Sequence, residues 1–220
     1  MKIITAFAPA TVANLGCGFD IMGLAIKGDG DIVSVRLDED MQHHEYKEDN
    51  LSIVNRSGVD LPKSIDHNVI TPAVRAFMDS LRIKMASPNS YYDIEVDILK
   101  KIYPGSGVGS SAASSSAAVY ALNKIFNSPF SEMELVYFAM QGEKLLSGVA
   151  HADNVAPAIM GGVTLIRGYA PFDIVRLPIP ESFHSAVVHP HLTVLTSEAR
   201  KVLPENVPLR KSVSQWGNVG

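Results

Sequence analysis

The sequence contains a single cysteine, Cys17, so no disulfide can form within the chain, and such sparse usage is typical of a reducing compartment. It also lacks an apolar run of membrane-spanning length, and Met1 to Ile4 lead into small and polar residues instead of a secretory signal. We therefore expect a cytoplasmic protein that has no contact with membranes.

Positive charge is scarce as well. The chain has 19 Lys and Arg residues against 23 Asp and Glu residues, a formal charge of -4, and no basic run carries interleaved aromatic residues. Nucleic-acid binding is therefore not expected. The phosphates of any bound nucleotide must be met locally, by backbone N–H groups and a metal ion. With 46% hydrophobic and 19% charged residues, the composition is that of a globular protein.

Hydrophobic periodicity predicts both strands and helices. Alternation or apolar runs predict strands over residues 31–37, 92–99 and 163–166. An apolar stripe over residues 74–81 predicts a helix with Thr71 as its cap and Pro72 in its first turn. The S-x-x-E pattern at Ser131 predicts a capping box and another helix. The mixture indicates an α+β fold, and the frequent prolines after Arg167 place a domain boundary near Gly168.

One segment, residues 103–113, is unusually rich in glycine and serine and reads Tyr-Pro-Gly-Ser-Gly-Val-Gly-Ser-Ser-Ala-Ala. Its three alternate glycines let backbone N–H groups turn toward one point. Apolar residues at helical spacing follow, up to Phe126, so the N-terminus of a helix adds its N–H groups and its dipole. The segment predicts a phosphate site, where Ser110 and Ser111 can offer hydroxyls to a phosphate or to Mg²⁺.

Other functional loops do not fit this segment. A Walker loop ends in Gly-Lys-Ser/Thr and a dinucleotide fingerprint reads G-x-G-x-x-G, whereas this loop has no lysine and reads G-x-G-x-G. A nucleophile elbow, G-x-S-x-G, does not occur. A flexible linker would not run directly into an apolar helix. Taken alone, however, a glycine-rich turn before a helix is more often structural than nucleotide-binding.

Residues 105–113 are similar to the ATP-binding motif of the superfamily of galactokinase, homoserine kinase, mevalonate kinase and phosphomevalonate kinase. Val108 replaces the usual leucine, and Pro104 lies one position closer to the glycines than usual. Residues 8–20, Ala-Pro-Ala-Thr-Val-Ala-Asn-Leu-Gly-Cys-Gly-Phe-Asp, resemble the opening of homoserine kinases specifically. With residues 151–158, three separated motifs follow the family's order, and the likeness runs from Lys2 to about Leu203.

The resemblance implies an ATP site and a Mg²⁺ site. The implied ATP-binding residues are Pro104, Gly105, Ser106, Gly107, Val108, Gly109, Ser110, Ser111 and Ala112. The implied Mg²⁺ ligands are Ser111 and Glu143. Glu143 follows Val136, Ala139 and Met140 at helical spacing, which places its carboxylate beside an apolar helix face. The alternative is a surface glutamate paired with a lysine.

The resemblance also implies a pocket for an amino-acid substrate. Its implied residues are Asn14, Asp20, His151, Asn154, Thr196 and Arg200, with Asp153 and Asn154 as the catalytic pair. Asp20 suits an ammonium group, and the guanidinium fork of Arg200 suits a carboxylate. By chemistry alone, a capping Asn14 and a surface Asp20 in a tight loop are the favoured interpretation, and Arg200 is more often just a surface charge. Residues 151–154 could be a loop held by its own side chains.

The implied activity is transfer of the γ-phosphate of ATP to the hydroxyl of L-homoserine, giving O-phospho-L-homoserine for threonine biosynthesis. The implied fold is an N-terminal domain like ribosomal protein S5 domain 2 over residues 1–168, with the beginning of a ferredoxin-like domain over 169–220. The implied assembly is a homodimer. The alternatives are another small-molecule kinase of the superfamily, or a non-catalytic relative, which would be expected to lose Ser111 or Glu143.

Overall fold

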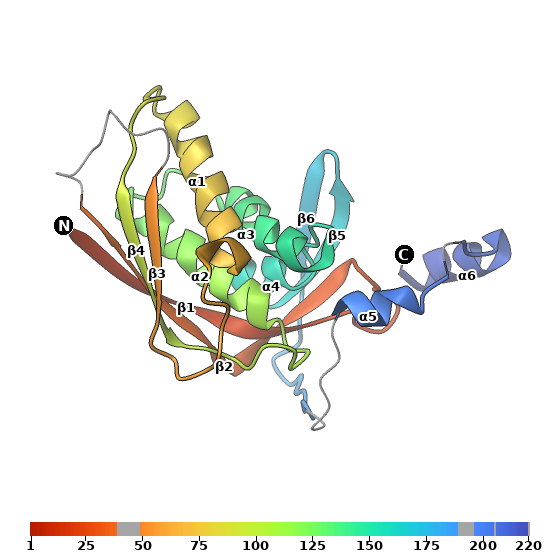
Figure 1. Cartoon of the computed structure of the whole chain (residues 1–220). Helices are drawn as coiled ribbons and strands as arrows, with labels where there is room; N and C mark the ends of the chain where they lie inside the picture. Colours follow the sequence, from red (N-terminus) through yellow and green to blue (C-terminus); the bar gives the residue numbers. More distant parts are fainter. Residues whose placement is uncertain (39–48, 189–195, 205, 220) are drawn as a thin grey trace.

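The computed structural model describes residues 1–38, 49–188, 196–204 and 206–219. One sheet forms a layer, and helices pack against one face of it (Figure 1). The strands are β1 (Lys2–Ala13), β2 (Met22–Leu37), β3 (Asn50–Asn55), β4 (Asp93–Lys100), β5 (Val163–Tyr169) and β6 (Phe172–Leu177). The helices are η1 (Ile65–His67), α1 (Ile70–Lys84), α2 (Ser110–Ile125), α3 (Glu132–Ser147), α4 (Val155–Met160), α5 (Thr196–Lys201) and α6 (Leu209–Val219). This mixture confirms the α+β class.

The long strand β2 organises the sheet, whose order is β3-β4-β2-β5-β6 with β1 also paired to β2. β1 runs antiparallel along nearly the whole of β2. The other edge of β2 is shared, because β4 pairs with residues 32–37 and β5 with residues 22–24. Among the paired strands of the described residues, β3 and β4 are the parallel pair. The chain that follows β4 therefore begins beside the part of β2 that lies between its pairing with β4 and its pairing with β5.

The predicted strands are confirmed, and each buries alternate side chains. Residues 33, 35 and 37 of β2 and residues 94, 96 and 98 of β4 are at most 1% exposed. Because successive side chains of a strand point to opposite faces, this alternation places one apolar face against the helices. The hydrophobic core therefore lies between the sheet and helices α1 to α4.

Helix α2 is the central helix and is built from small residues. Most of its side chains are fully buried, including Ala112, Ala113, Ala117, Ala118 and Ala121. Gly142 of α3 lets the two helices approach closely, since a Cβ there would lie 2.4 Å from Ser115 Oγ. Small side chains thus allow α2 to pass between the sheet and α3 and to carry its N-terminus to the glycine-rich loop.

Of the two predicted helix starts, that of α3 is confirmed and the predicted cap of α1 is wrong. Ser131 and Glu134 form the predicted capping box at the start of α3, an arrangement worth about 1 kcal/mol. Thr71 is not a cap, because α1 begins one residue earlier and the Thr71 hydroxyl donates to the carbonyl of Ile65. Asn68 Oδ1 accepts the N–H of Ile70 instead, at 3.0 Å. Pro72 does lie in the first turn, as predicted.

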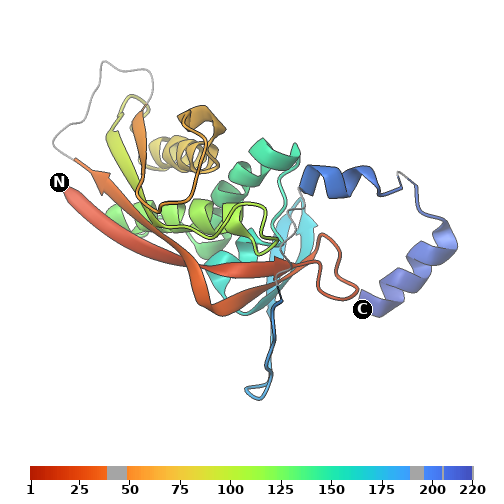
Figure 2. The ribbon, with the colours of Figure 1, turned by 60° about the horizontal axis from the view of Figure 1, so that its bottom comes forward.

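After β6 the described chain leaves the sheet, and α5 and α6 lie beyond the end where β1 leads into β2 (Figure 2). The Cys17 thiol donates to the carbonyl of Asn218 at 3.1 Å, which ties α6 to that turn. The predicted boundary near Gly168 falls within β5, and β6 continues the same sheet, so the division into domains stays a prediction. None of the helices in the described ranges has the length and apolarity to cross a membrane.

Candidate active site

The glycine-rich loop joins the end of β4 to the start of α2. Gly105, Gly107 and Gly109 have φ angles of 76°, 74° and 65°, in the left-handed region that favours glycine. No side chain in the described chain caps α2, so its first N–H groups are available to an anion. The Ser106 hydroxyl is enclosed and has no hydrogen-bond partner among the described residues. These features are the ones that bind phosphate in proteins.

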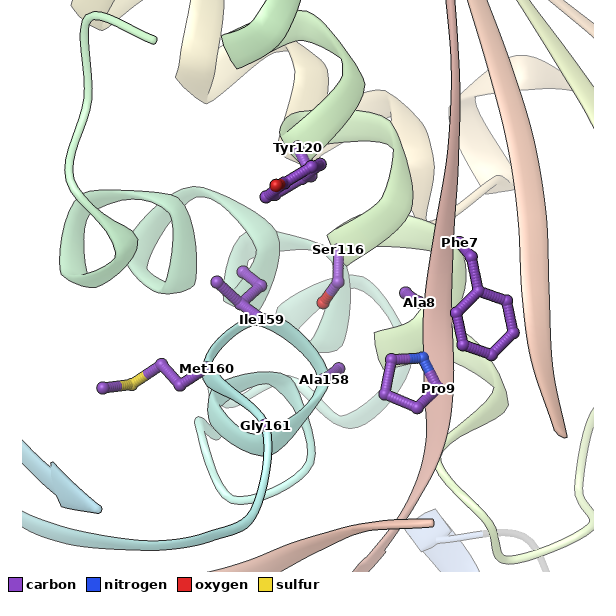
Figure 3. A pocket seen from close by; sticks show the side chains of 9 residues that line it. All are labelled: Phe7, Ala8, Pro9, Ser116, Tyr120, Ala158, Ile159, Met160 and Gly161. Carbon is purple, nitrogen blue, oxygen red and sulfur yellow. The ribbon is translucent and has the colours of Figure 1, made fainter. Parts of the chain in front are cut away.

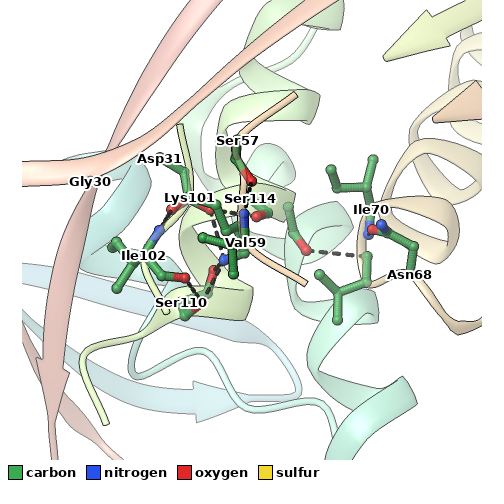
Figure 4. Close-up of polar contacts among 12 residues, drawn as sticks. Gly30, Asp31, Ser57, Val59, Asn68, Ile70, Lys101, Ile102, Ser110 and Ser114 are labelled. Carbon is green, nitrogen blue, oxygen red and sulfur yellow. Dashed lines mark hydrogen bonds and ion pairs between the residues drawn. The ribbon is translucent and has the colours of Figure 1, made fainter. Parts of the chain in front are cut away.

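A buried ion pair supports the start of this loop (Figure 4). Lys101 Nζ lies 2.9 Å from Asp31 Oδ2, and the two side chains are 4% and 0% exposed. The same carboxylate accepts the N–H of Ile102 at 2.7 Å and the hydroxyl of Ser114. Lys101 also donates to the carbonyl of Ser110. The network therefore fastens β2, the loop and the first turns of α2 to one another.

Sequence reasoning missed both members of this ion pair. Asp31 carried a signal, because it continues the alternation of Val33, Val35 and Leu37 and so belongs to the buried face of β2. Lys101 carried none, since it follows β4 without a pattern of its own. Burial lowers the pKa of Lys101, and attraction to Asp31 opposes that shift.

Three of the predicted substrate residues come together at the turn between β1 and β2. Arg200, in the last turn of α5, donates to Asp20 Oδ1 at 2.6 Å, although 180 residues separate them. His151 Nδ1 lies 4.0 Å from Asp20 Oδ2. His151 Nε2 and Arg200 Nε are enclosed and have no hydrogen-bond partner within the described ranges. The Asp20 carboxylate is thus close to both the His151 ring and the Arg200 guanidinium, and each of these two side chains keeps one nitrogen for a further hydrogen bond.

Asn14 and Thr196 were also predicted to contact the substrate. Asn14 lies in the same turn, and its Oδ1 accepts the N–H of Asp20 at 2.8 Å. Both residues have positive φ, 59° and 60°, which is uncommon for residues other than glycine but is tolerated best by Asn and Asp. Asn14 therefore braces the turn that presents Asp20. Thr196 begins α5, but its side chain lies outside the described part of the chain.

The two predicted metal ligands are neighbours. The Ser111 side chain hydrogen bonds with Glu143, whose pKa is raised first by burial and also by the nearby Asp153 carboxylate. The Ser111 hydrogen bond and Lys101 oppose this rise. The Glu143 carboxylate is thus set against the first turn of α2, in agreement with the helix face predicted from its spacing.

Residues 151–154 lie between α3 and α4 and include a further buried carboxylate, Asp153. Burial raises the pKa of Asp153, the Asp20 carboxylate raises it further, and His151 lowers it. The backbone of this segment is held in two ways. Tyr169 Oη accepts the N–H of Ala152 at 3.2 Å, and Gly23 of β2 gives room for Asp153, whose carbonyl oxygen would lie 1.7 Å from a Cβ there.

The Asp153 carboxylate therefore interacts electrostatically with Asp20 and with Glu143, and Glu143 interacts in the same way with Lys101. These interactions link the Asp20 cluster to the buried Lys101–Asp31 pair. Sequence reasoning also missed Tyr169, because a tyrosine near the end of a strand carries no local signal of a role.

A separate hollow of about 330 Å³ lies between β1, α2 and α4 (Figure 3). Its lining residues are Phe7, Ala8, Pro9, Ser116, Tyr120, Ala158, Ile159, Met160 and Gly161. The lining is mostly apolar, and none of the predicted site residues belongs to it. We therefore place the candidate site at the glycine-rich loop and not in this hollow.

Replacing Gly107 with valine should lower the affinity for ATP by about tenfold or more, as measured by titration calorimetry. The residue has a φ of 74°, and a Cβ built there meets nothing within 4 Å. A valine side chain would strain the loop and project into the space in front of it, where a phosphate must approach.

Gly148, at the end of α3, is the matched control because it has a φ of 76° and also faces open space. Gly148→Val should cost similar stability and leave the affinity for ATP unchanged. Equal affinities for ATP in the parent and in Gly107→Val would remove the loop from the nucleotide site.

Comparison with known proteins agrees with this geometry. Residues 68–162 match the GHMP kinases N terminal domain. The chain is 44% identical over 225 residues to a homoserine kinase of Chlorobium phaeobacteroides, covering all of this chain and 68% of that protein. It is also 44% identical over 222 residues to a homoserine kinase of Chlorobaculum tepidum, covering 67% of it.

The crystal structure of homoserine kinase from Cytophaga hutchinsonii superposes with a TM-score of 0.79 at 39% identity. It matches all of this chain, which covers 66% of that protein. The chain thus spans about two thirds of the length of these relatives. Full coverage of this sequence at such identity, together with the matching fold, shows that the chain belongs to the homoserine kinase family of the GHMP kinases.

Proposed function

We propose that the protein transfers the γ-phosphate of ATP to the hydroxyl of L-homoserine. The observation that carries the proposal is the cluster of Asp20, Arg200 and His151 beside residues 153–154 and the glycine-rich loop. An α-amino acid presents an ammonium and a carboxylate at one carbon, so its pocket needs opposite charges aimed at one place. Asp20 and Arg200 supply them, and the homoserine kinases among the relatives support the choice of substrate.

Asp20 and Arg200 contact each other directly. A zwitterionic amino acid can replace this contact with one hydrogen bond to each of the two residues. Its ammonium takes the place of the guanidinium at Asp20, and its carboxylate takes the place of Asp20 at Arg200. His151 Nε2 and Arg200 Nε are the further contacts that a substrate can make, because burying an unpartnered polar group is unfavourable.

For the nucleotide we propose residues 104–112 as the phosphate cradle. The N–H groups at the start of α2 and the enclosed Ser106 hydroxyl donate to phosphate oxygens. Transfer of a phosphoryl group depends on positioning and on neutralising charge, rather than on covalent chemistry by the protein. Lys101, fixed by Asp31, holds the loop in the shape that the phosphates require.

Ser111 and Glu143 suit Mg²⁺. Both offer oxygen, the donor that Mg²⁺ prefers, and Mg²⁺ in kinases is commonly held by one or two carboxylates together with the phosphates. A buried Glu143 whose pKa is raised gains from a cation that offsets its charge. When bound there, the ion supplies positive charge beside the transferred phosphate. Asp153 and Asn154 are proposed as the residues nearest the reacting hydroxyl.

We extend the proposal to the domains, the cellular location and the assembly of the protein. The N-terminal part resembles ribosomal protein S5 domain 2, and a ferredoxin-like domain begins after residue 168. The whole protein works in the cytoplasm as a homodimer, without nucleic-acid or membrane partners. Analytical ultracentrifugation of the whole protein tests the assembly directly, since a homodimer has twice the mass of one subunit.

Asp20→Asn in the whole protein should raise the KM for homoserine about 10- to 100-fold, and the KM for ATP much less. A charge-assisted hydrogen bond contributes about 1.5–3 kcal/mol, which corresponds to this range. Arg200→Lys should also impair homoserine use, because a point charge cannot reproduce the guanidinium fork. The measurement is ADP release with L-homoserine, L-serine and mevalonate as acceptors.

The exposed pair Arg167–Asp173, 2.7 Å apart, provides the control. Asp173→Asn and Arg167→Lys make the same chemical changes away from the site and should leave both KM values as they are. The substrate assignment fails if Asp20→Asn and Arg200→Lys use homoserine normally while their affinity for ATP falls.

A further inference from the structure

Thr11 is a buried hydroxyl residue that no sequence motif singled out for a role. It lies near the end of β1, its side chain is 0% exposed, and Thr11 Oγ1 donates to Asn154 Oδ1 at 2.9 Å. The two residues are 143 positions apart. Their hydrogen bond therefore exists only because the fold brings the end of β1 to the start of α4.

The backbone is irregular at this point, and the irregularity turns Thr11 inward. The pairing of β1 with β2 shifts between Pro9 and Thr11. Ala6, Ala8 and Ala10 are buried in alternation, and regular pleating would turn Thr11 to the opposite face, yet it is buried directly after Ala10. Irregularities of this kind in a strand commonly re-aim a side chain beside an active site.

The side chain of Asn154 accepts this hydrogen bond and does not cap the helix that it begins. It occupies the N-cap position of α4, where an asparagine side chain normally accepts an N–H from the first turn. Its side chain makes no such bond here. Its Oδ1 is instead occupied by Thr11, which leaves Nδ2, with its two N–H donors, for another partner.

The end of the glycine-rich loop is shaped around this pair. A Cβ on Gly109 would lie 1.9 Å from Thr11 Oγ1 and 3.0 Å from Asn154 Oδ1. The N–H of Thr11 also donates to the carbonyl of Val108 at 3.1 Å. Thr11 thus touches the phosphate loop through its backbone and Asn154 through its side chain.

We infer that Thr11 is a positioning residue, which fixes the amide of Asn154 so that Nδ2 donates to an oxygen of the reacting groups beside the phosphate loop. The inference rests on the proposed function for the identity of those groups. It assigns Asn154 the part of a hydrogen-bond donor, because Thr11 holds the amide oxygen and Nδ2, with its two N–H groups, is the side-chain atom left to meet the reacting groups. A donor held in advance stabilises charge that develops on oxygen during phosphoryl transfer.

Thr11→Val tests the inference, because valine keeps the shape and the backbone N–H of Thr11 and removes only the hydroxyl. In the whole protein kcat should fall about 10- to 100-fold, as misplacement of a reacting group predicts. The affinity for ATP, measured by calorimetry, should stay within about twofold, since the bond to Val108 persists. Thr11→Ser should recover most of the lost turnover. Thr5→Val, which removes an exposed hydroxyl from the same strand, is the control.

Two further measurements separate positioning from general support. The variant Thr11→Val combined with Asn154→Ala should be no slower than Asn154→Ala alone, because Thr11 acts through Asn154. The side-chain amide signals of Asn154 in a ¹⁵N NMR spectrum, assigned by their loss in Asn154→Ala, should move in Thr11→Val and return in Thr11→Ser.

If the parent shows no homoserine-dependent ADP release, the proposed function is overturned but the role of Thr11 is not. The NMR result still tests that role, because it does not depend on any activity. Unchanged Asn154 signals in Thr11→Val would overturn the role of Thr11. Additive losses of kcat in the double variant, or a loss of ATP affinity that matches the loss of kcat, would do the same.

Discussion

Glu143→Gln is expected to lower turnover by about 100-fold or more, with partial recovery at high Mg²⁺ concentration. A metal ion at a transferring phosphate supplies several kcal/mol, and each 1.36 kcal/mol is tenfold in rate. A neutral amide binds Mg²⁺ more weakly than a carboxylate, so excess ion restores part of the rate. The measurement is ADP release with L-homoserine as a function of Mg²⁺ concentration.

The same variant should raise the melting temperature at neutral pH. The pKa of Glu143 in the folded protein is raised above its ordinary value of 4.5. For such a group the stabilising contribution is full below the unfolded pKa and is lost as pH rises through the folded pKa. Glutamine carries no charge to bury, so the gain in stability should appear at neutral pH and vanish below pH 4.5.

Glu134 on the same helix is the matched control. Burial acts to raise the pKa of Glu134, but the hydrogen bonds with Ser131 and the interaction with Lys84 together outweigh it, so the pKa is lowered. Glu134→Gln should therefore leave turnover unchanged and should not raise the melting temperature at neutral pH. If Glu143→Gln keeps the turnover and the Mg²⁺ dependence of the parent, Glu143 belongs to the helix surface and not to a metal site.

Lys101→Met is expected to destabilise the protein by about 3–5 kcal/mol, because it leaves the Asp31 carboxylate buried without its cation. For a chain of this size that is a drop of roughly 6–20 °C in melting temperature. Burial lowers the pKa of Lys101 in spite of Asp31, so desolvation of the ammonium outweighs the attraction. The loss therefore comes from the stranded carboxylate and not from the missing charge of the lysine.

Two controls test that cause. Lys101→Met combined with Asp31→Asn removes both charges and should recover much of the lost stability. Lys100→Met breaks the neighbouring pair with Asp29, whose side chains are 48% and 64% exposed. Exposed pairs contribute about 0–1 kcal/mol, so this variant should melt close to the parent. A small effect of Lys101→Met, similar to that of Lys100→Met, would contradict a structural role for the buried pair.

Local sequence was sufficient for some of the elements that carry the site. Regular alternation predicted the strands over residues 31–37 and 92–99, since the two faces of a strand meet different surroundings, whereas β1, α4 and α5 were not predicted. The S-x-x-E pattern predicted the start of α3, and the glycine run the turn before α2, because each of these is formed by residues within a few positions of one another. The spacing of Glu143 behind Val136, Ala139 and Met140 also predicted the helix face on which it lies. In these cases the interactions that decide the structure are themselves local.

The contacts that make these elements into a site were decided by the tertiary structure. Asp31 meets Lys101 across 70 residues, Thr11 meets Asn154 across 143, and Asp20 meets Arg200 across 180. The resemblance to homoserine kinases named Asp20 and Arg200 as substrate residues, but their direct contact had no signal in the sequence. The burial of Thr11 opposed the pattern of its strand, because the register of β1 against β2 shifts beside it. Pairing across strands depends on register and on packing, which single residues and their spacing do not encode.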